Sequence, residues 1–293
     1  MASQLATSAL APSSQAAYTR AFNKYRNFCA CHIIICALPI SVEFFACFLT
    51  SLFDAGLPHS SISSISSALS YFHKWYDVPD PSQTFLIKQI LTAIRKQRPS
   101  RDSRHPISIH TLQLLVNILP ALNLPPYDSS MLLAMFVLAF HFALRIGEMT
   151  DTVHNLFFHD IVACPAKLTI RFSSFKHAPS HVADHVISAS LAPTCPVQAV
   201  NNYLALRGNS FGPLFILNSN PISRDYFVSK LKACFLALGI SDPRFNTHSF
   251  RIGAASYWAL NKGYSDLQIQ KLGRWQSNAF LKYIRGQIEH SLD

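Results

Sequence analysis

The 293-residue sequence predicts a mainly helical protein with one small β-sheet (an α+β fold), divided into two domains. Three observations predict this class. Apolar residues recur three or four positions apart through most of the chain, which is the period of a helix buried on one face. Between roughly residues 155 and 190 this period gives way to short alternating, β-branched runs. A basic segment at residues 95–106 separates two apolar regions and contains no apolar residue.

The first domain is predicted to be a four-helix unit at residues 13–96, preceded by a disordered N-terminus at residues 1–12. Ser13 and Ser14 are suitable N-caps for a helix that runs to about Cys29. Three further helices are expected, at residues 42–53, from residue 58 onward, and at residues 83–95. Residues 97–107 are expected to be the linker to the second domain.

The second domain is predicted to span residues 108–293. Strands are expected at residues 168–172 and 182–188, forming a hairpin or a three-stranded sheet. The most apolar stretch, residues 131–144, contains His141 and is too short to cross a bilayer, so it is predicted to be a buried helix and no membrane association is expected. Helices are expected at residues 108–119, 129–144, 196–206, 224–238, 247–260, 265–272 and 278–284.

The formal net charge is +10, because 25 lysines and arginines face only 15 carboxylates. Such a balance attracts polyanions, and nucleic acid is the obvious partner, although charge alone equally fits a solvated basic surface. The basic segment is predicted to contact a DNA backbone, the alternative being a flexible surface loop. The residues expected to make these contacts are Arg95, Lys96, Arg98, Arg101 and Arg104.

Several classes of site are not indicated. The seven cysteines are scattered, which indicates a reducing compartment rather than a disulfide framework. The run Cys29, Cys31, His32, Cys36 lacks a second pair of ligands, so no metal site is predicted. No nucleotide-binding glycine loop, nucleophile elbow, HExxH motif or carboxylate cluster is present. Phosphate chemistry would therefore depend on cationic side chains, and no cofactor is expected.

Suitable cations occur in two short segments. Arg145 directly follows the most buried helix, and Glu148 is one turn further on, where it can orient the arginine. His248 and Arg251 are three residues apart at a helix start and share a face. Arginine is suited to a phosphodiester transition state because its planar fork donates two parallel hydrogen bonds and stays charged.

These segments, in their order along the chain, resemble the signature of the tyrosine recombinase (phage integrase) family. The resemblance covers an N-terminal helical core-binding domain, a basic linker and a mixed helical catalytic domain. The sequence around the tyrosine is most similar to that of eukaryotic members, the recombinases of DIRS-type retrotransposons and Crypton elements. The matching segments are Leu144-Arg145-Ile146-Gly147-Glu148, His248-Ser249-Phe250-Arg251, Gly273-Arg274-Trp275 and Tyr283-Ile284-Arg285.

The resemblance implies a role for each matching residue. Arg145 and Arg251 would clamp the scissile phosphate, with Glu148 supporting Arg145. Tyr283 would attack, and His248 would bind the phosphate or assist proton transfer. Lys176 would protonate the leaving 5′ oxygen, with Lys167 as its rival.

The third phosphate contact departs from the family pattern. Many members have histidine or tryptophan nine residues before the tyrosine, where this chain has Arg274 and then Trp275. Trp275 is the preferred candidate, because its indole N–H can donate a hydrogen bond. Arg274 is the alternative.

The resemblance implies a DNA recombinase or integrase that acts on double-stranded DNA through a 3′-phosphotyrosine, without metal or ATP. It further implies a homo-tetramer at synapsis, and the eukaryotic character suggests the nucleus. Two alternatives stay open: a catalytically silent DNA-binding protein derived from such an enzyme, and a type IB topoisomerase-like enzyme. The N-terminal helical domain favours recombination over topoisomerase activity.

Overall fold

The computed structural model describes residues 9–99, 102–152, 154–172 and 183–284 of the chain. Its contacts divide the chain into two compact units, Met1–Asp102 (unit 1) and Ser103–Asp293 (unit 2). In the described part of the chain, no helix is long and apolar enough to cross a membrane.

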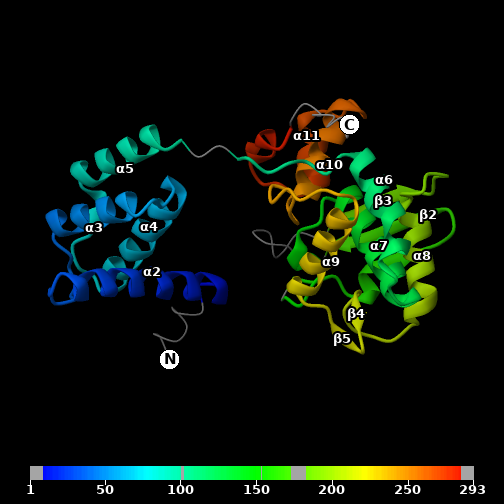
Figure 1. The fold of residues 1–293 in the computed structure, drawn as a ribbon, viewed down its shortest axis with the longest axis horizontal. Coiled ribbons are helices and arrows are strands. Elements are labelled where there is room, and N and C mark those ends of the chain that lie inside the picture. The colour runs from blue at the N-terminus through cyan, green and yellow to red at the C-terminus, as the bar shows by residue number, and fades with distance from the viewer. Residues whose placement is uncertain (1–8, 100–101, 153, 173–182, 285–293) are drawn as a thin grey trace. The chain divides into compact units, whose positions relative to one another are not determined.

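In the described residues of unit 1, 9–99 and 102, the chain forms four α-helices and a short 3-10 turn (Figure 1). Their buried apolar residues form a single core, in which Tyr25, Phe45 and Phe48 are the largest side chains. Buried His73 accepts a hydrogen bond from the backbone N–H of Ile40, which attaches α4 to the segment before α3. The elements are α2 (Pro12–Cys31), α3 (Val42–Asp54), α4 (His59–Trp75), η1 (Pro81–Gln83) and α5 (Phe85–Gln97).

The expected N-caps of the first helix are wrong. Helix α2 already begins at Pro12, with Ala11 as its N-cap, so Ser13 and Ser14 lie inside the first turn. Proline is favoured there because its fixed φ suits a helix and its missing N–H is not needed in the first turn. Helix α3 follows the expected rule, because the hydroxyl of Ser41 accepts a hydrogen bond from the backbone N–H of Phe44.

The segment between the units is partly attached to unit 2. The backbone N–H of His105 donates to the carbonyl of Arg244, and that of Ile107 donates to the carbonyl of Ser249. Ile107 is completely buried in the unit 2 core. From about residue 105, the segment that follows α5 is therefore packed and hydrogen-bonded as part of unit 2.

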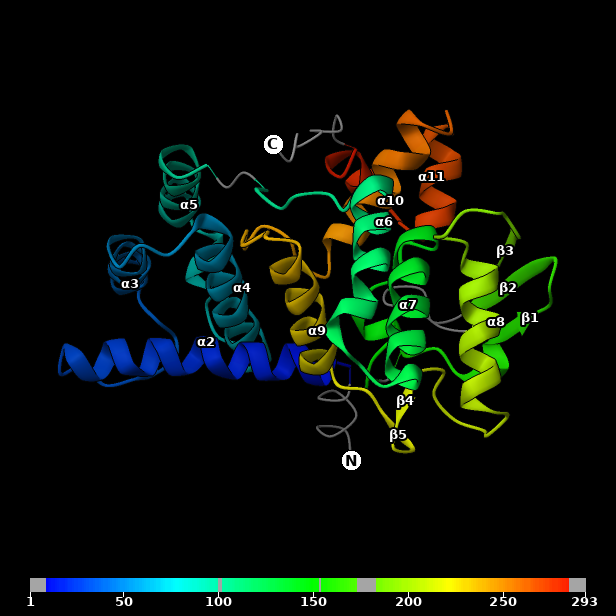
Figure 2. The ribbon, with the colours of Figure 1, turned by 45° about the vertical axis from the view of Figure 1, so that its right-hand side comes forward.

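Unit 2 is organised around α7 (Pro126–His141), which is apolar on all sides and therefore buried. Helices α6 (Ile109–Ile118), α8 (Pro196–Arg207) and α10 (Ser249–Leu260) pack directly against it, as Figures 1 and 2 show. Helix α9 (Arg224–Ala237) packs against α6, and α11 (Asp266–Gly273) packs against α10. The remaining helical turns are η2 (Leu119–Leu122), η3 (Ile146–Glu148), η4 (Phe158–Asp160) and η5 (Asn278–Lys282).

A three-stranded antiparallel sheet lies against α8 (Figure 2). Its order is β1 (Ile161–Ala163), β2 (Lys167–Phe172) and β3 (Ala183–Ser188), and Phe172 is the partner of Ala183 at one end of the β2–β3 ladder. A second pair, β4 (Ile216–Leu217) and β5 (Asn220–Pro221), was not expected from the sequence. The predicted fold class, mainly helical with a small antiparallel sheet, is confirmed.

Candidate active site

Arg145 and Glu148 form a local ion pair at the end of the most buried helix. After α7 the backbone reverses at Ala143, whose φ is +45°, and Arg145 then starts the 3-10 turn η3. Oε2 of Glu148 accepts the backbone N–H of Arg145 at 2.8 Å, and Oε1 accepts Nη1 of the same arginine at 3.2 Å. The side chain of Arg145 is 26% exposed and that of Glu148 only 3%. The guanidinium therefore lies on the open side of the pair.

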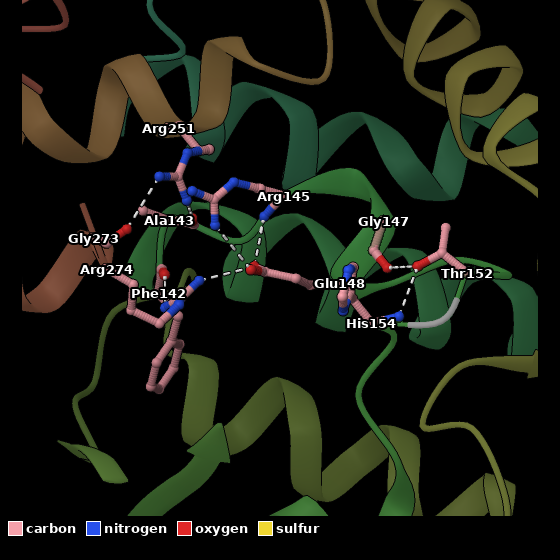
Figure 3. Close-up of polar contacts among 10 residues, drawn as sticks. All are labelled: Phe142, Ala143, Arg145, Gly147, Glu148, Thr152, His154, Arg251, Gly273 and Arg274. Atoms are coloured by element: carbon pink, nitrogen blue, oxygen red, sulfur yellow. Dashed lines mark hydrogen bonds and ion pairs between the residues drawn. The ribbon is translucent and has the colours of Figure 1, made fainter. Parts of the chain in front are cut away.

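Arg251 crosses from α10 to the same place and is 1% exposed. One terminal nitrogen donates to the carbonyl of Ala143, and the other donates to the carbonyl of Gly273 at 3.0 Å (Figure 3). Burial, followed by repulsion from Arg145 and Arg274, lowers the pKa of Arg251 to about 9. The side chain is still protonated at neutral pH, and its hydrogen bonds go to neutral carbonyl groups.

Arg274 completes the cluster from the turn that follows α11. Its Nη2 lies 2.8 Å from Oε2 of Glu148, and its Nη1 donates to the carbonyl of Phe142 at 3.1 Å. Its guanidinium carbon lies 3.8 Å from the ring centroid of Phe172, at the end of β2. A face of the guanidinium is thus covered by an aromatic ring, as in other cation–π contacts.

The cluster carries more positive than negative charge. Burial alone would raise the pKa of Glu148, but the charges of Arg274, Arg145 and Arg251 outweigh it, and the pKa is lowered. Glu148 is therefore ionised at neutral pH, and one carboxylate faces three guanidinium groups. A buried surplus of positive charge is costly unless an anion compensates it. The arrangement is suited to an anion bound beside Arg145.

Aromatic side chains connect the arginines to Tyr283. The ring of Trp275 lies 4.7 Å from the guanidinium carbon of Arg251 and 5.9 Å from the ring centroid of Tyr283. The ring of His248, at the N-cap of α10, meets the ring of Tyr283 edge-on at 5.0 Å. Tyr283 is half-buried, and its backbone carbonyl accepts the hydroxyl of Ser256 at 2.9 Å. Tyr283 is thereby held at the edge of the arginine cluster.

Two glycines allow this packing. A Cβ on Gly273 would lie 1.6 Å from Cζ3 of Trp275, so the indole can lie over residue 273 only when that residue is glycine. A Cβ on Gly253 would lie 1.8 Å from the carbonyl oxygen of Ile107. The glycine of the His248-x-x-Arg251-x-Gly253 segment therefore allows α10 to approach the chain that enters unit 2.

The structure brings most of the sequence-predicted residues together: Arg145, Glu148, His248, Arg251, Arg274, Trp275 and Tyr283. Lys176 lies outside the described residues. Its rival Lys167 is exposed and begins β2, about 16 Å along the strand from Phe172, the end that contacts Arg274. Lys167 is therefore far from the cluster end of this strand.

Sequence reasoning missed Phe172, His185 and Ser256. Phe172 occupies an inward position of the alternating strand, and this alternation was the available signal. His185 packs edge-on against Phe172, and burial, followed by repulsion from Arg274, lowers its pKa to about 4. Nothing in the sequence around Ser256 distinguishes it from the other serines.

The basic residues expected to contact DNA have different environments. Arg95 and Lys96 are exposed in the last turn of α5. Arg98 is bound within unit 1, because it donates to the carbonyl of Phe53 at 2.6 Å and lies over the ring of the same residue. Arg104 is half-buried, and Arg101 lies outside the described residues.

A basic cavity of about 670 Å³ lies between α2 and α4 in unit 1. Helix α2 contributes Arg20 and Lys24, and the first turns of α4 contribute the hydroxyl groups of Ser60 and Ser61. Neither helix contains a carboxylate. Cations, hydroxyls and the N-terminus of a helix are the groups that bind phosphate in proteins.

In the described part of the chain, no group of three or more His, Cys, Asp or Glu side chains is placed to hold a metal ion. No family model matches the sequence, and no curated protein matches it.

Solved structures do match. A lambda integrase dimer bound to a COC′ core site is 16% identical with a TM-score of 0.65, over 97% of this chain and 74% of that one. XerH site-specific recombinase in a post-cleavage complex with palindromic difH is 15% identical with a TM-score of 0.63, over 91% and 74%. The Tn1549 transposon integrase with transposon right end DNA is 12% identical with a TM-score of 0.59, over 85% and 82%. The chain therefore has the fold of these integrases and this recombinase.

Proposed function

We propose that the chain is a DNA strand transferase of the tyrosine recombinase type, which breaks and rejoins DNA through a phosphotyrosine at Tyr283. One observation carries the proposal: Arg145 and Arg251 lie with His248, Trp275 and Tyr283 in one cluster, which carries more positive than negative charge. The residues come from segments up to 138 positions apart, and the fold is the one seen in DNA-bound integrases.

Arg145 and Arg251 would bind the non-bridging oxygens of the scissile phosphate. Negative charge grows on these oxygens in the pentavalent transition state, and preorganised donors stabilise it without reorganising. Trp275 would add its indole N–H as a third donor. Removing one such donor usually costs about 100- to 1000-fold in rate, so Arg145→Ala and Arg251→Ala are each expected to lose this much.

In the first step the Oη of Tyr283 forms a bond to phosphorus, and the bond from phosphorus to the 5′ oxygen breaks. The phenol proton would pass to His248, whose ring lies against that of Tyr283. The leaving 5′ oxygen would take a proton from Lys176, the role that the family resemblance implies. The second step reverses the first with the 5′ hydroxyl of another strand. A phosphodiester is exchanged for a phosphodiester, so the reaction requires no ATP.

Unit 1 would bind the sugar-phosphate backbone of the DNA. The cavity between α2 and α4 offers Arg20, Lys24 and serine hydroxyls to phosphate, and Arg95 and Lys96 extend the basic surface at the end of α5. Arg98 is left out of this set because its guanidinium is already used within unit 1. The partner is double-stranded DNA, and the chain would form a homo-tetramer when two sites synapse.

The element type is also part of the proposal. The sequence motifs Gly273-Arg274-Trp275 and Tyr283-Ile284-Arg285 are most similar to those of DIRS-type and Crypton recombinases, which implies a transposon protein acting in the nucleus.

Crosslinking of the protein on paired DNA sites, followed by measurement of the mass of the complex, tests for the tetramer.

The deciding test is a suicide-substrate assay. Nicked DNA libraries are incubated with wild type and with Tyr283→Phe in EDTA, and the products are run on a denaturing gel. A slow-migrating, protease-sensitive band with wild type alone supports the proposal. Relaxation of a supercoiled plasmid without strand exchange between two sites would point to a type IB topoisomerase instead. DNA binding without any adduct would point to a catalytically silent derivative.

A further inference from the structure

Arg274 lies on the buried side of the arginine cluster, not on its open side. Its side chain is 1% exposed, compared with 26% for Arg145. Both terminal nitrogens are engaged, one by Glu148 and the other by the carbonyl of Phe142. One face of the guanidinium lies against Phe172. These partners belong to η3, to the residue after α7 and to β2, so the arginine joins three segments.

The carboxylate of Glu148 connects Arg274 to Arg145. Its Oε2 accepts Arg274 at 2.8 Å together with the backbone N–H of Arg145, and its Oε1 accepts the guanidinium of Arg145. Figure 3 shows the contacts of both Arg274 and Arg145 meeting at the carboxylate of Glu148. Because Glu148 is almost fully buried, its orientation is set by these donors.

We infer that Arg274 is a positioning residue for the proposed phosphate clamp: by holding Glu148 it fixes the guanidinium of Arg145 and ties this pair to β2 through Phe172. The inference rests on the proposed function and assigns a role to the position where sequence spacing alone expects a phosphate contact. Trp275, over Arg251 and beside Tyr283, is left as the residue on the phosphate side.

The backbone at residue 274 supports this assignment. Arg274 has φ +54° and ψ +47°, a left-handed conformation at the C-cap of α11. Consecutive residues in such a turn point in different directions, here Arg274 to Glu148 and Trp275 to Arg251. To reach a phosphate bound beside Arg145, the Arg274 guanidinium would have to leave a buried carboxylate. Breaking a buried pair in this way is strongly unfavourable.

Lysine cannot replace this arginine fully. Its single ammonium nitrogen cannot serve Glu148 and Phe142 with the geometry of a planar fork, and it has no flat face to lie on Phe172. Arg274→Lys thus keeps the positive charge but loses the hydrogen-bond geometry of the planar fork. Arg274→Gln loses both the charge and this geometry. We expect adduct formation to slow about 10-fold in the first and about 100-fold in the second, the loss typical of a small misplacement of a catalytic group.

The test compares two suicide DNAs that differ only at the scissile position, after wild type has mapped it. One carries the normal phosphodiester and the other carries a methylphosphonate, in which a neutral methyl group replaces a charged oxygen. The second substrate no longer needs the arginine that stabilises that charge. Single-turnover adduct formation is measured for wild type, Arg274→Gln, Arg145→Lys and the double variant.

Positioning through Arg145 predicts a specific pattern. The Arg274→Gln loss is about 100-fold on the phosphodiester, shrinks to within about threefold on the methylphosphonate, and adds little to the loss of Arg145→Lys, because residues that act through one another are not additive. A loss equally large on both DNAs would mean a purely structural role. A loss that multiplies with that of Arg145→Lys would mean that Arg274 contacts the phosphate itself. Either result overturns the inference.

Two controls keep the outcome readable. If thermal melting shows that Arg274→Gln does not fold, the same comparison is made with Arg274→Lys and with Phe172→Leu, which keeps the ion pair and removes the aromatic ring beside it. No adduct with wild type on any DNA would overturn the proposed function itself. An adduct with wild type, combined with either contrary pattern above, overturns only the role of Arg274.

Discussion

The indole of Trp275 lies directly over Gly273, so close that a Cβ on residue 273 would stand 1.6 Å from Cζ3 of the ring. This contact places Trp275 against both Arg251 and Tyr283. The need for glycine at residue 273 is therefore linked to the alignment of Arg251 and Tyr283 in the proposed chemistry.

Gly273→Ala is therefore expected to displace Trp275 and to slow adduct formation by about 100-fold, the cost of misplacing catalytic groups. Stability should fall by about 1–3 kcal/mol because the site is overpacked. Single-turnover cleavage and urea unfolding measure the two effects. Trp275→Phe is the companion variant, since it keeps an aromatic ring at residue 275 and removes the N–H together with the five-membered ring of the indole. An unchanged cleavage rate in Gly273→Ala would show that the position of Trp275 over residue 273 is not needed for cleavage.

Gly253→Ala is expected to destabilise unit 2 by about 1–3 kcal/mol, because its Cβ would lie 1.8 Å from the carbonyl oxygen of Ile107. The close contact lies between α10 and the chain that enters unit 2, which is hydrogen-bonded there through Ile107 and Ser249. Thermal or urea unfolding measures the change. Gly56→Ala is the control: it meets no atom within 4 Å and carries only the strain of its positive φ of +87°. A smaller loss at Gly253 than at Gly56 would contradict the packing argument.

Tyr226→Phe separates stability from chemistry. The hydroxyl of Tyr226, on α9, donates to Oδ2 of Asp128 at 2.8 Å, and burial together with this carboxylate raises its pKa. Loss of a hydrogen bond to a charged group should cost about 1.5–3 kcal/mol. Adduct formation at 25 °C should stay within about twofold of wild type, because the residue is outside the arginine cluster. A large rate loss in this variant would show that cleavage simply follows stability.

Stability should fall as the pH drops from about 6.5 to about 4. Burial is the largest cause that lowers the pKa of His141 to about 4, and burial likewise lowers that of His185 to about 4. In both cases the folded-state pKa lies below the unfolded value, so the unfolded chain binds the proton more tightly in this window and is favoured by acid. Each shift corresponds to about 3 kcal/mol once the pH reaches the folded-state value.

Urea midpoints at pH 7.5 and pH 5 measure this effect. Carboxylates also begin to titrate near the acid end, so the informative quantity is the difference between wild type and His141→Gln. The variant should lose less stability on acidification than wild type. Equal pH slopes in the two proteins would show that His141 is not held neutral in the folded state.

The sequence predicted helices well where an apolar face repeats over several turns, as in α4 and α5, and less well where the chain turns tightly. Asn218 and Ser219 have φ of +49° and +65° between β4 and β5. Asparagine and serine tolerate such turns, but strands of two residues give no periodicity to detect. The expected helix at residues 278–284 is a 3-10 turn, Asn278–Lys282, which also leaves little periodic signal.

For the candidate site, spacing along the chain identified which segments meet but not which side chain faces which. The sequence made Trp275 the preferred third phosphate contact and Arg274 the alternative, but it did not show which residues either side chain faces. Their directions depend on a left-handed turn at residue 274, which non-glycine residues adopt rarely and which no motif indicated. Phe172, whose ring covers a face of the Arg274 guanidinium, is 102 residues earlier on a strand, and this contact could be assigned only from the folded chain.

Arg274 and Arg251 each donate to a backbone carbonyl directly after α7, Arg274 to that of Phe142 and Arg251 to that of Ala143. Peptide dipoles add along a helix, so this end of α7 carries a partial negative charge of about half an electron. The cluster thus gains a counter-charge from groups that hold no proton and cannot be titrated. A change of pH that protonates or deprotonates side chains elsewhere in unit 2 therefore leaves this backbone contribution constant.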